Sequence, residues 1–431
     1  MSDRIRVLDA FENPESNWKE KAEENINRFR KGIAKIKVVD QNGNPVSNAK
    51  ISVSQLKHEF RFGANCFLLD ELETPEKNEI YKKKFAQIFN MATLPFYWCD
   101  LEPTEGKTRY TIGSPKIYRR PTIDLCLQYC EENGIEPREH ALAYDHFFPE
   151  WLAERSVDEI KEALELHMKE IADLYKDKIR TIEVTNEMFW PKWVTPLYKE
   201  SDYVEWCFKT ARKYFPDNQL VVNECTRSAW GRTEYFDYLL ENFKKGAPMD
   251  AIGLQCHIFF EQEKIDVLYN PEQLVKELDM YAQFNKPLQL TEITIPAYSY
   301  NEEDEEIQAK IIEYLYTIWF SHPNLEQIIY WNLVDGYAAF VEQGDMTGGE
   351  NQYYGGLLRF DMSEKPSYKV LDNLINKKWH TEEDIQTNED GIASFDGFYG
   401  DYEVKVSTES GEIVESINFS SKGLHDYTII I

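Results

Sequence analysis

The stretch TIEVTNE at residues 181–187 begins as a buried β-strand and ends in two polar side chains. Its β-branched residues favour a pleated, buried strand, whereas Asn186 and Glu187 are poor strand formers that are costly to bury. A second stretch, PLQLTEITI at residues 287–295, repeats the pattern with Glu292 near its end. Both stretches therefore predict buried strands that carry a carboxylate at their carboxyl ends.

The chain around these stretches alternates short apolar runs with helical patterns between residues 59 and 378. Eight strand-then-helix units of this size predict an α/β fold, a (β/α)8 TIM barrel with some enlarged loops. A doubly wound sheet is disfavoured because no GxGxxG turn is present. The eight predicted strands lie within residues 60–67, 89–98, 135–144, 179–187, 219–225, 249–257, 287–295 and 326–335.

The two flanks of this region are richer in strand patterns. Residues 33–58 read as two strands joined by an Asn-Pro turn, and residues 388–431 contain several more. Because a two-stranded unit is marginal by itself, we expect both flanks to join in one small β-sandwich. The predicted organisation is a helical segment at 1–30, first sandwich strands at 31–58, the barrel at 59–380 and remaining sandwich strands at 381–431.

Composition narrows the range of partners. With 431 residues, of which 42% are hydrophobic, the chain can build one large and one smaller core. Its formal charge of −28 offers no basic face, so we expect no nucleic-acid or membrane partner. Neither CxxC spacing nor any other cofactor or metal motif is present, so none is predicted. Without a signal-peptide pattern we expect a cytoplasmic protein, or a secreted one if a signal peptide has been removed.

Polar and aromatic residues follow six of the predicted strands. In a barrel the carboxyl ends of the strands form one mouth, which is where active sites lie. Packing gives no reason for so many polar groups at one rim, and paired carboxylates there are typical of glycosidic bond cleavage. The candidate site residues are His140, Tyr144, Asn186, Glu187, Gln255, His257, Glu292 and Trp331.

Several motifs in this set resemble glycoside hydrolase family ten, the xylanase-type barrels. VTNE at 184–187 is similar to the family's V-x-N-E strand, GLQCH at 253–257 to its G-x-Q-x-H, and LTEITI at 290–295 to its nucleophile strand. WNLVDG at 331–336 and the stretch from 356 to 371 resemble its closing motifs. The combination is specific although each motif is short, and it covers about residues 59–376.

The resemblance implies roles for the matching residues. Glu187 would be the general acid/base and Glu292 the nucleophile of a double displacement. Asn186 would bind the 2-hydroxyl of the sugar at the cleavage point, and His140, Gln255 and Trp331 would complete that subsite. His257 would donate a hydrogen bond to the ionised Glu292.

The sequence also departs from the family pattern on the glycone side. The Asn and Lys that hold a second sugar have no counterparts in TLPFYWCD, where Tyr97 or Cys99 takes the Lys position. Tyr144 stands where the family usually has a Trp, Phe147 where it has a Gln, and Thr294 where it has an Asp. The region Ala339–Phe340 stands in place of the family's last Trp. We therefore expect an apolar wall, formed by Tyr97, Tyr144, Phe147 and Phe340.

Three functions remain open at this point. The first is a retaining hydrolase of β-glycosidic bonds, similar to endo-β-1,4-xylanases but with altered glycone subsites. The second is a β-glycosidase that acts on a non-xylan glycoside or glycoconjugate. The third is a non-catalytic carbohydrate-binding protein. Each has a carbohydrate or glycoside as its partner, and retention of both carboxylates favours an enzyme.

Overall fold

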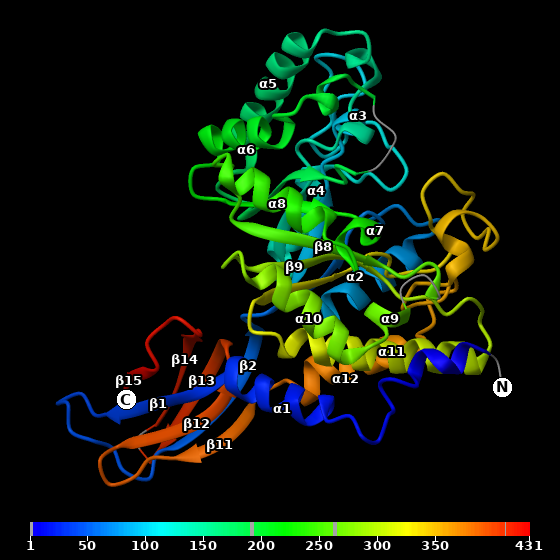
Figure 1. The fold of residues 1–431 in the computed structure, drawn as a ribbon. Helices are drawn as coiled ribbons and strands as arrows, with labels where there is room; N and C mark the ends of the chain where they lie inside the picture. The colour runs from blue at the N-terminus through cyan, green and yellow to red at the C-terminus, as the bar shows by residue number, and fades with distance from the viewer. Residues whose placement is uncertain (1–2, 190–193, 262–264, 410) are drawn as a thin grey trace.

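The centre of the molecule is a closed barrel of eight parallel strands in a computed structural model that describes residues 3–189, 194–261, 265–409 and 411–431. Neighbouring strands follow the order β10-β3-β4-β5-β6-β7-β8-β9 (Figure 1). The barrel and the flanking sheets confirm the predicted fold class. The barrel strands are β3 Arg61–Asn65, β4 Met91–Pro95, β5 Glu136–His140, β6 Thr181–Asn186, β7 Gln219–Glu224, β8 Ala251–His257, β9 Leu288–Thr294 and β10 Leu325–Tyr330.

Helices follow the barrel strands and cover their outer faces. Several begin at residues with the expected capping chemistry. Ser156 and Glu159 form a capping box at the start of α5, and Asn301 accepts a hydrogen bond from Asp304 at the start of α11. The helices of the barrel region are α2 Pro75–Ile88, α3 Trp98–Leu101, α4 Ile123–Glu132, α5 Val157–Tyr175, α6 Tyr203–Tyr214, α7 Thr226–Ala229, α8 Glu234–Lys244, α9 Ile265–Leu268, α10 Pro271–Ala282, α11 Glu302–Ser321 and α12 Pro366–Asn373.

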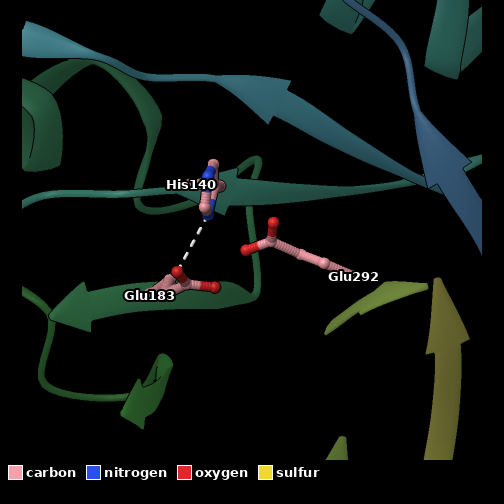
Figure 2. Close-up of side chains that lie close together, drawn as sticks. All are labelled: His140, Glu183 and Glu292. Atoms are coloured by element: carbon pink, nitrogen blue, oxygen red, sulfur yellow. Dashed lines mark hydrogen bonds and ion pairs between the residues drawn. The ribbon is translucent and has the colours of Figure 1, made fainter. Parts of the chain in front are cut away.

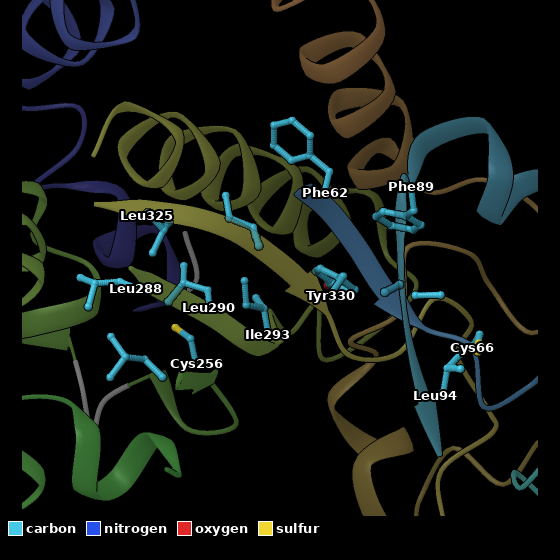
Figure 3. Close-up of a cluster of buried hydrophobic side chains, with 14 of the residues drawn as sticks. Phe62, Cys66, Phe89, Leu94, Cys256, Leu288, Leu290, Ile293, Leu325 and Tyr330 are labelled. Carbon is cyan, nitrogen blue, oxygen red and sulfur yellow. The ribbon is translucent and has the colours of Figure 1, made fainter. Parts of the chain in front are cut away.

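One continuous apolar core lies between the strands and these helices. Aliphatic residues on alternate positions of β9 and β10, such as Leu288, Leu290 and Leu325, are fully or almost fully buried (Figure 3). The opposite positions of these strands point into the barrel and carry polar groups such as Gln289 and Gln327, which are equally buried. This alternation follows from the period-two geometry of a strand and leaves the polar face free to build a site.

Two further sheets form the small sandwich, seen below the barrel in Figure 1. One sheet has the order β12-β1-β15 and the other β11-β2-β13-β14. Both draw on the two flanks of the chain, and they enclose a shared core that includes Ile36, Val53, Phe395 and Val404. The strands are β1 Lys31–Val39, β2 Lys50–His58, β11 Glu382–Gln386, β12 Ile392–Phe398, β13 Gly400–Thr408, β14 Gly411–Phe419 and β15 Asp426–Ile430.

The N-terminal segment and the sandwich both pack on the barrel. A 3-10 helix at Asp3–Leu8 and α1 Trp18–Phe29 lie against α11, where Trp18 contacts the Tyr314 ring edge-on. At the junction with the sandwich, His58 contacts aromatic rings of both parts, Phe62 in the barrel and Phe398 in β12. Among the described residues, no helix combines the length and apolar composition needed to cross a bilayer.

Removing residues 381–431 is expected to lower Tm by several degrees and to increase binding of a hydrophobic dye. The truncation takes away every partner strand of β1 and β2, so their buried apolar faces become exposed. Differential scanning fluorimetry measures both effects. Val414→Thr, at a half-exposed position in the same sheet, is the control and is expected to change neither. A truncated chain that melts like the whole would contradict the shared core.

Candidate active site

All eight predicted site residues line one cavity of about 640 Å³ at the carboxyl ends of the barrel strands. Its volume lies within the usual range for ligand pockets. The residues come from different strands: Gln255 and His257 from β8, Glu292 from β9, and His140 from the end of β5. Tyr144 and Trp331 lie in the loops directly after β5 and β10. The fold therefore brings together residues that are far apart in the sequence.

Glu187 directly follows β6 and has a positive φ of 52°, which turns the chain sharply at the rim. The Tyr144 hydroxyl donates a hydrogen bond to its Oε2, and Gln255 Nε2 donates to its Oε1 at 3.0 Å. Burial and the negative charge of Glu292 raise the pKa of Glu187 above its ordinary value. Glu187 is therefore suited to carry a proton when a substrate arrives.

Glu292 lies on β9 and is only 4% exposed. Its Oε1 accepts hydrogen bonds from Asn223 Nδ2 at 3.1 Å and Gln255 Nε2 at 3.0 Å. His257 Nε2 lies 3.2 Å from its Oε2. Burial alone would lower the pKa of His257, but the hydrogen bond and charge of Glu292 outweigh it, so that pKa is raised. These three neighbours hold the Glu292 carboxylate in a fixed orientation in the cavity.

The side chain of Gln255 joins the two carboxylates. Its Nε2 lies 3.0 Å from Glu187 Oε1 and 3.0 Å from Glu292 Oε1. The two oxygens are therefore separated by at most twice that distance. Gln255 is 1% exposed, and its position on β8, between β7 and β9, makes this spacing a property of the barrel. The two carboxyl groups are thus held close together by one shared donor.

A second layer of charge lies beneath these groups. Glu183 on β6 is fully buried, forms an ion pair with Arg138 and accepts a hydrogen bond from His140 Nδ1 at 2.8 Å. Figure 2 shows Glu292 extending toward this His140–Glu183 pair. Burial would raise the pKa of Glu183, but His140 and Arg138 outweigh it and lower that pKa. Glu183 is thus an ionised anchor that fixes the His140 ring.

Possible metal ligands in this group are His140, Glu183 and Glu292, whose nearest ligand atoms lie within 4.8 Å of one another. Each of these carboxylates already accepts hydrogen bonds from neighbouring donors. The buried Arg138 guanidinium beside Glu183 also opposes a second cation. The arrangement therefore fits a hydrogen-bond network better than a metal site.

Asn186 is oriented by two neighbouring amides. Its Oδ1 accepts hydrogen bonds from Asn223 Nδ2 at 3.0 Å and Gln255 Nε2 at 3.2 Å. Within the described residues its Nδ2 has no protein partner, and the side chain lines the cavity. Gly253 makes room for this network, because a Cβ there would lie 2.6 Å from Asn223 Oδ1. Asn186 is thereby set to donate a hydrogen bond to a ligand hydroxyl.

Aromatic rings form the floor and one wall of the cavity. Trp331 contacts the rings of His140 and His257 edge-on, with centroids 5.4 Å and 5.9 Å away. Tyr97 donates or accepts a hydrogen bond with His140 Nε2 at 3.1 Å and stacks on Phe147 with centroids 4.2 Å apart. Such flat apolar surfaces beside polar groups suit the faces and hydroxyls of sugars.

The predicted apolar wall is right for three residues and wrong for one. Tyr97, Tyr144 and Phe147 pack in one cluster with Phe67. Phe340 lines the cavity mouth but is 90% exposed, so it does not pack in that cluster. Phe340, with a φ of 60°, lies in a loop after β10. A local sequence pattern does not show how far such a loop extends from the barrel.

Thr294 takes part in the site although it departs from the expected Asp. Its hydroxyl lies 2.9 Å from His257 Nδ1 and so fixes the ring that contacts Glu292. The Thr294 hydroxyl is neutral, whereas an Asp would add a negative charge. The main group that raises the pKa of His257 is therefore Glu292. The substitution keeps the orientation of the ring and removes one negative charge from its far side.

Several residues of the site were absent from the sequence-based set. Glu183 has a usable signal, since TIEVT alternates polar and aliphatic residues and its polar face points into the barrel. Asn223 and Glu224 also end a strand, and burial raises the pKa of Glu224 to about 8. Arg119 and Arg120 lie in a long loop between α3 and α4, where no periodicity marks them.

Comparison with known proteins shows the family to which the chain belongs. Residues 54–372 match the model of the family described as glycosyl hydrolase family 10. The anti-sigma-I factor RsgI6 of Acetivibrio thermocellus is 24% identical over 96% of this chain and 48% of its own length. Endo-1,4-beta-xylanase 1 of Arabidopsis thaliana is 23% identical over 90% of this chain and 38% of its own. The chain thus spans less than half the length of these two relatives.

Solved structures show the same fold. Native xylanase 10B from Thermotoga maritima aligns with a TM-score of 0.59 at 22% identity, over 74% of this chain and 96% of that one. A family 10 structure from Paenibacillus barcinonensis aligns with a TM-score of 0.60 at 20% identity, over 74% and 95%. The family match covers most of the barrel and confirms the resemblance seen in the motifs. The chain belongs to glycosyl hydrolase family 10.

Proposed function

We propose that this chain is a retaining O-glycoside hydrolase that cleaves β-glycosidic bonds, similar in action to endo-1,4-β-xylanases. The single observation that carries the proposal is the shared contact of Gln255 Nε2 with both carboxylates. It limits the distance between the two Oε1 atoms to at most twice 3.0 Å. Such closeness favours the spacing of roughly 5–5.5 Å between the carboxyl groups of retaining enzymes over the roughly 6.5–9.5 Å of inverting ones. Several of the matching proteins are named as endo-1,4-beta-xylanases.

The two carboxylates divide the chemistry between them. Glu187, whose pKa is raised, protonates the oxygen of the leaving group as the bond from that oxygen to C1 breaks. The Glu292 carboxylate, oriented by Asn223 and Gln255, forms the new bond to C1 and gives a covalent glycosyl-enzyme. Glu187, now ionised, removes a proton from water as that water displaces Glu292. Asn186 would donate to a hydroxyl of the same sugar throughout.

The glycone side supports a substrate other than plain xylan. By the resemblance, Tyr97 or Cys99 takes the position of a Lys that holds a second sugar, and Phe147 replaces a usual Gln. The rings of Tyr97 and Phe147 stack on each other. A stacked pair offers few hydrogen-bond donors to a sugar hydroxyl. The proposal therefore includes the second of the three open functions, a β-glycosidase that acts on a non-xylan glycoside. A purely sugar-binding protein would not need an acid with a raised pKa beside an ionised carboxylate.

The anomer of the first product tests the proposal. Early-time proton NMR during hydrolysis of aryl β-xylosides, aryl β-glucosides and xylo-oligosaccharides is expected to show the β-anomer before mutarotation, because two displacements restore the configuration. An initial α-anomer would contradict the retaining mechanism. Absence of turnover on all three substrate classes, by a folded protein that binds them, would favour the carbohydrate-binding alternative.

A further inference from the structure

Two adjacent arginines line the same wall of the cavity as Tyr97. Arg119 and Arg120 are buried, with exposed fractions of 4% and 7%. Arginine is seldom buried unless a carboxylate or phosphate pairs with it. This chain carries a formal charge of −28, so buried positive groups in its cavity call for a specific explanation.

Arg120 presents one edge of its guanidinium to the cavity. Its Nε donates to Asp100 at 2.6 Å and its Nη1 to the carbonyl oxygen of Arg119 at 2.9 Å. The guanidinium carbon lies 4.2 Å from the centroid of the Tyr97 ring, which fixes its plane. Its remaining nitrogen, Nη2, has no protein partner within the described part of the chain.

Arg119 is a buried cation without a carboxylate partner in the described residues. Its Nη1 donates to the Tyr337 carbonyl oxygen and its Nη2 to Asn332 Oδ1 at 3.1 Å, while its buried Nε has no partner. Glu350, whose charge acts on Arg119 and which also lines the cavity, accepts a hydrogen bond from Asn332 Nδ2 at 2.6 Å. Burial lowers the pKa of Arg119, in agreement with incomplete compensation of its charge.

The position of this pair determines what it can contact. The guanidinium carbons of Arg119 and Arg120 lie 5.9 Å and 5.5 Å from the ring centroid of Phe67, on the wall formed by β3 and β4. Glu187 and Glu292 come from β6 and β9, at other points of the barrel. The stretch TLPFYWCD, which contains Tyr97, resembles the family strand that holds a second glycone sugar. We therefore expect that sugar to bind beside the cavity wall that Tyr97 forms. The positive charge therefore lies beside that sugar rather than at the leaving group.

We propose that Arg120, through its Nη2 and with the positive charge of Arg119 beside it, binds an anionic substituent, a carboxylate or a sulfate ester, on the second sugar of the glycone side. The substrate class is then an acidic glycoside, which deepens the proposed function and rests on it. A planar guanidinium offers charge-assisted hydrogen bonds to such groups, whereas a neutral hydroxyl supplies no opposite charge. By the resemblance, Tyr97 and Phe147 stand where the family has polar residues. The arginine pair beside them offers contacts to an anion.

Calorimetric binding to the inactive Glu292→Gln variant tests this proposal without requiring turnover. The ligands are cellobiose, cellobiouronic acid with its uronate at the non-reducing end, and cellobiose sulfated at C6 of that sugar. At least one acidic ligand is expected to bind about tenfold or more tightly than cellobiose, with the ratio falling as salt increases. The two acidic ligands distinguish a carboxylate from a sulfate ester.

Variants in this background locate the effect. Arg119→Met and Arg120→Met are expected to reduce the acidic-to-neutral affinity ratio toward one. Arg227→Met is the matched control, because this exposed arginine lines the opposite part of the cavity and should leave the ratio unchanged. Equal affinity for all three ligands in the parent overturns the proposal even if an arginine variant fails to fold. Turnover of neutral glycosides with that outcome would leave the hydrolase function intact.

Discussion

Replacing Glu292 by alanine is expected to lower kcat on a β-glycoside by about 10⁴-fold, because the covalent intermediate can no longer form. Added azide should restore part of the turnover by entering the space of the lost carboxylate. Attack from that side by azide inverts the configuration, so the product should be the α-glycosyl azide. Steady-state kinetics and NMR of the azide product measure both results.

The control for this variant is Glu305→Gln on α11. Glu305 is also buried, at 3% exposure, but it pairs with Arg359 outside the cavity. We expect its substitution to affect stability more than kcat. If Glu292→Ala retained nearly full kcat, or if azide gave a β-product, Glu292 would not be the nucleophile.

Replacing Glu187 by alanine is expected to slow cleavage according to the leaving group. Substrates with poor leaving groups should lose about 10²–10⁴-fold in kcat, because they need protonation of the departing oxygen. Substrates with dinitrophenolate leaving groups should react readily in the first step and then accumulate the glycosyl-enzyme. Azide should here give the β-glycosyl azide, since Glu292 remains in place.

The pH profile provides a second readout for Glu187. Its protonated form acts first, and burial with the charge of Glu292 raises its pKa. Activity of the unmodified chain should therefore persist to higher pH than an ordinary carboxyl would permit and fall as pH rises through that pKa. The alanine variant should lack this alkaline fall. A fall at the same pH in both proteins would assign it to another group, such as His257.

The barrel and the carboxylate pair could be predicted because local chemistry determines them. Most barrel strands carry buried aliphatic residues at alternate positions. The polar groups at the strand ends have no evident packing role. Parallel strands in a closed barrel bring those ends to one rim. Glu187 and Glu292 therefore share one cavity with the six other residues that were selected from the sequence.

The remaining parts of the site depend on contacts that no local pattern encodes. Arg119 and Arg120 reach the cavity through a loop whose path follows from tertiary packing. The aromatic wall was predicted from substitutions at known positions, but Phe340 extends into solvent because its loop leaves the barrel. Glu183 lies inside a strand, where its ion pair with Arg138 becomes visible only when β5 and β6 are side by side.

The sandwich built from both flanks has a consequence for biosynthesis. β1 and β2 leave the ribosome first, yet β11 to β15 follow only after the whole barrel has been translated. At about 5–20 residues per second the delay is roughly 15–65 s. During that time β1 and β2 expose unpaired edges and an apolar face. All eight barrel strands are translated before the sandwich is complete. The nascent chain is thus open to aggregation, and to chaperone binding, in the interval before residues 381–431 emerge.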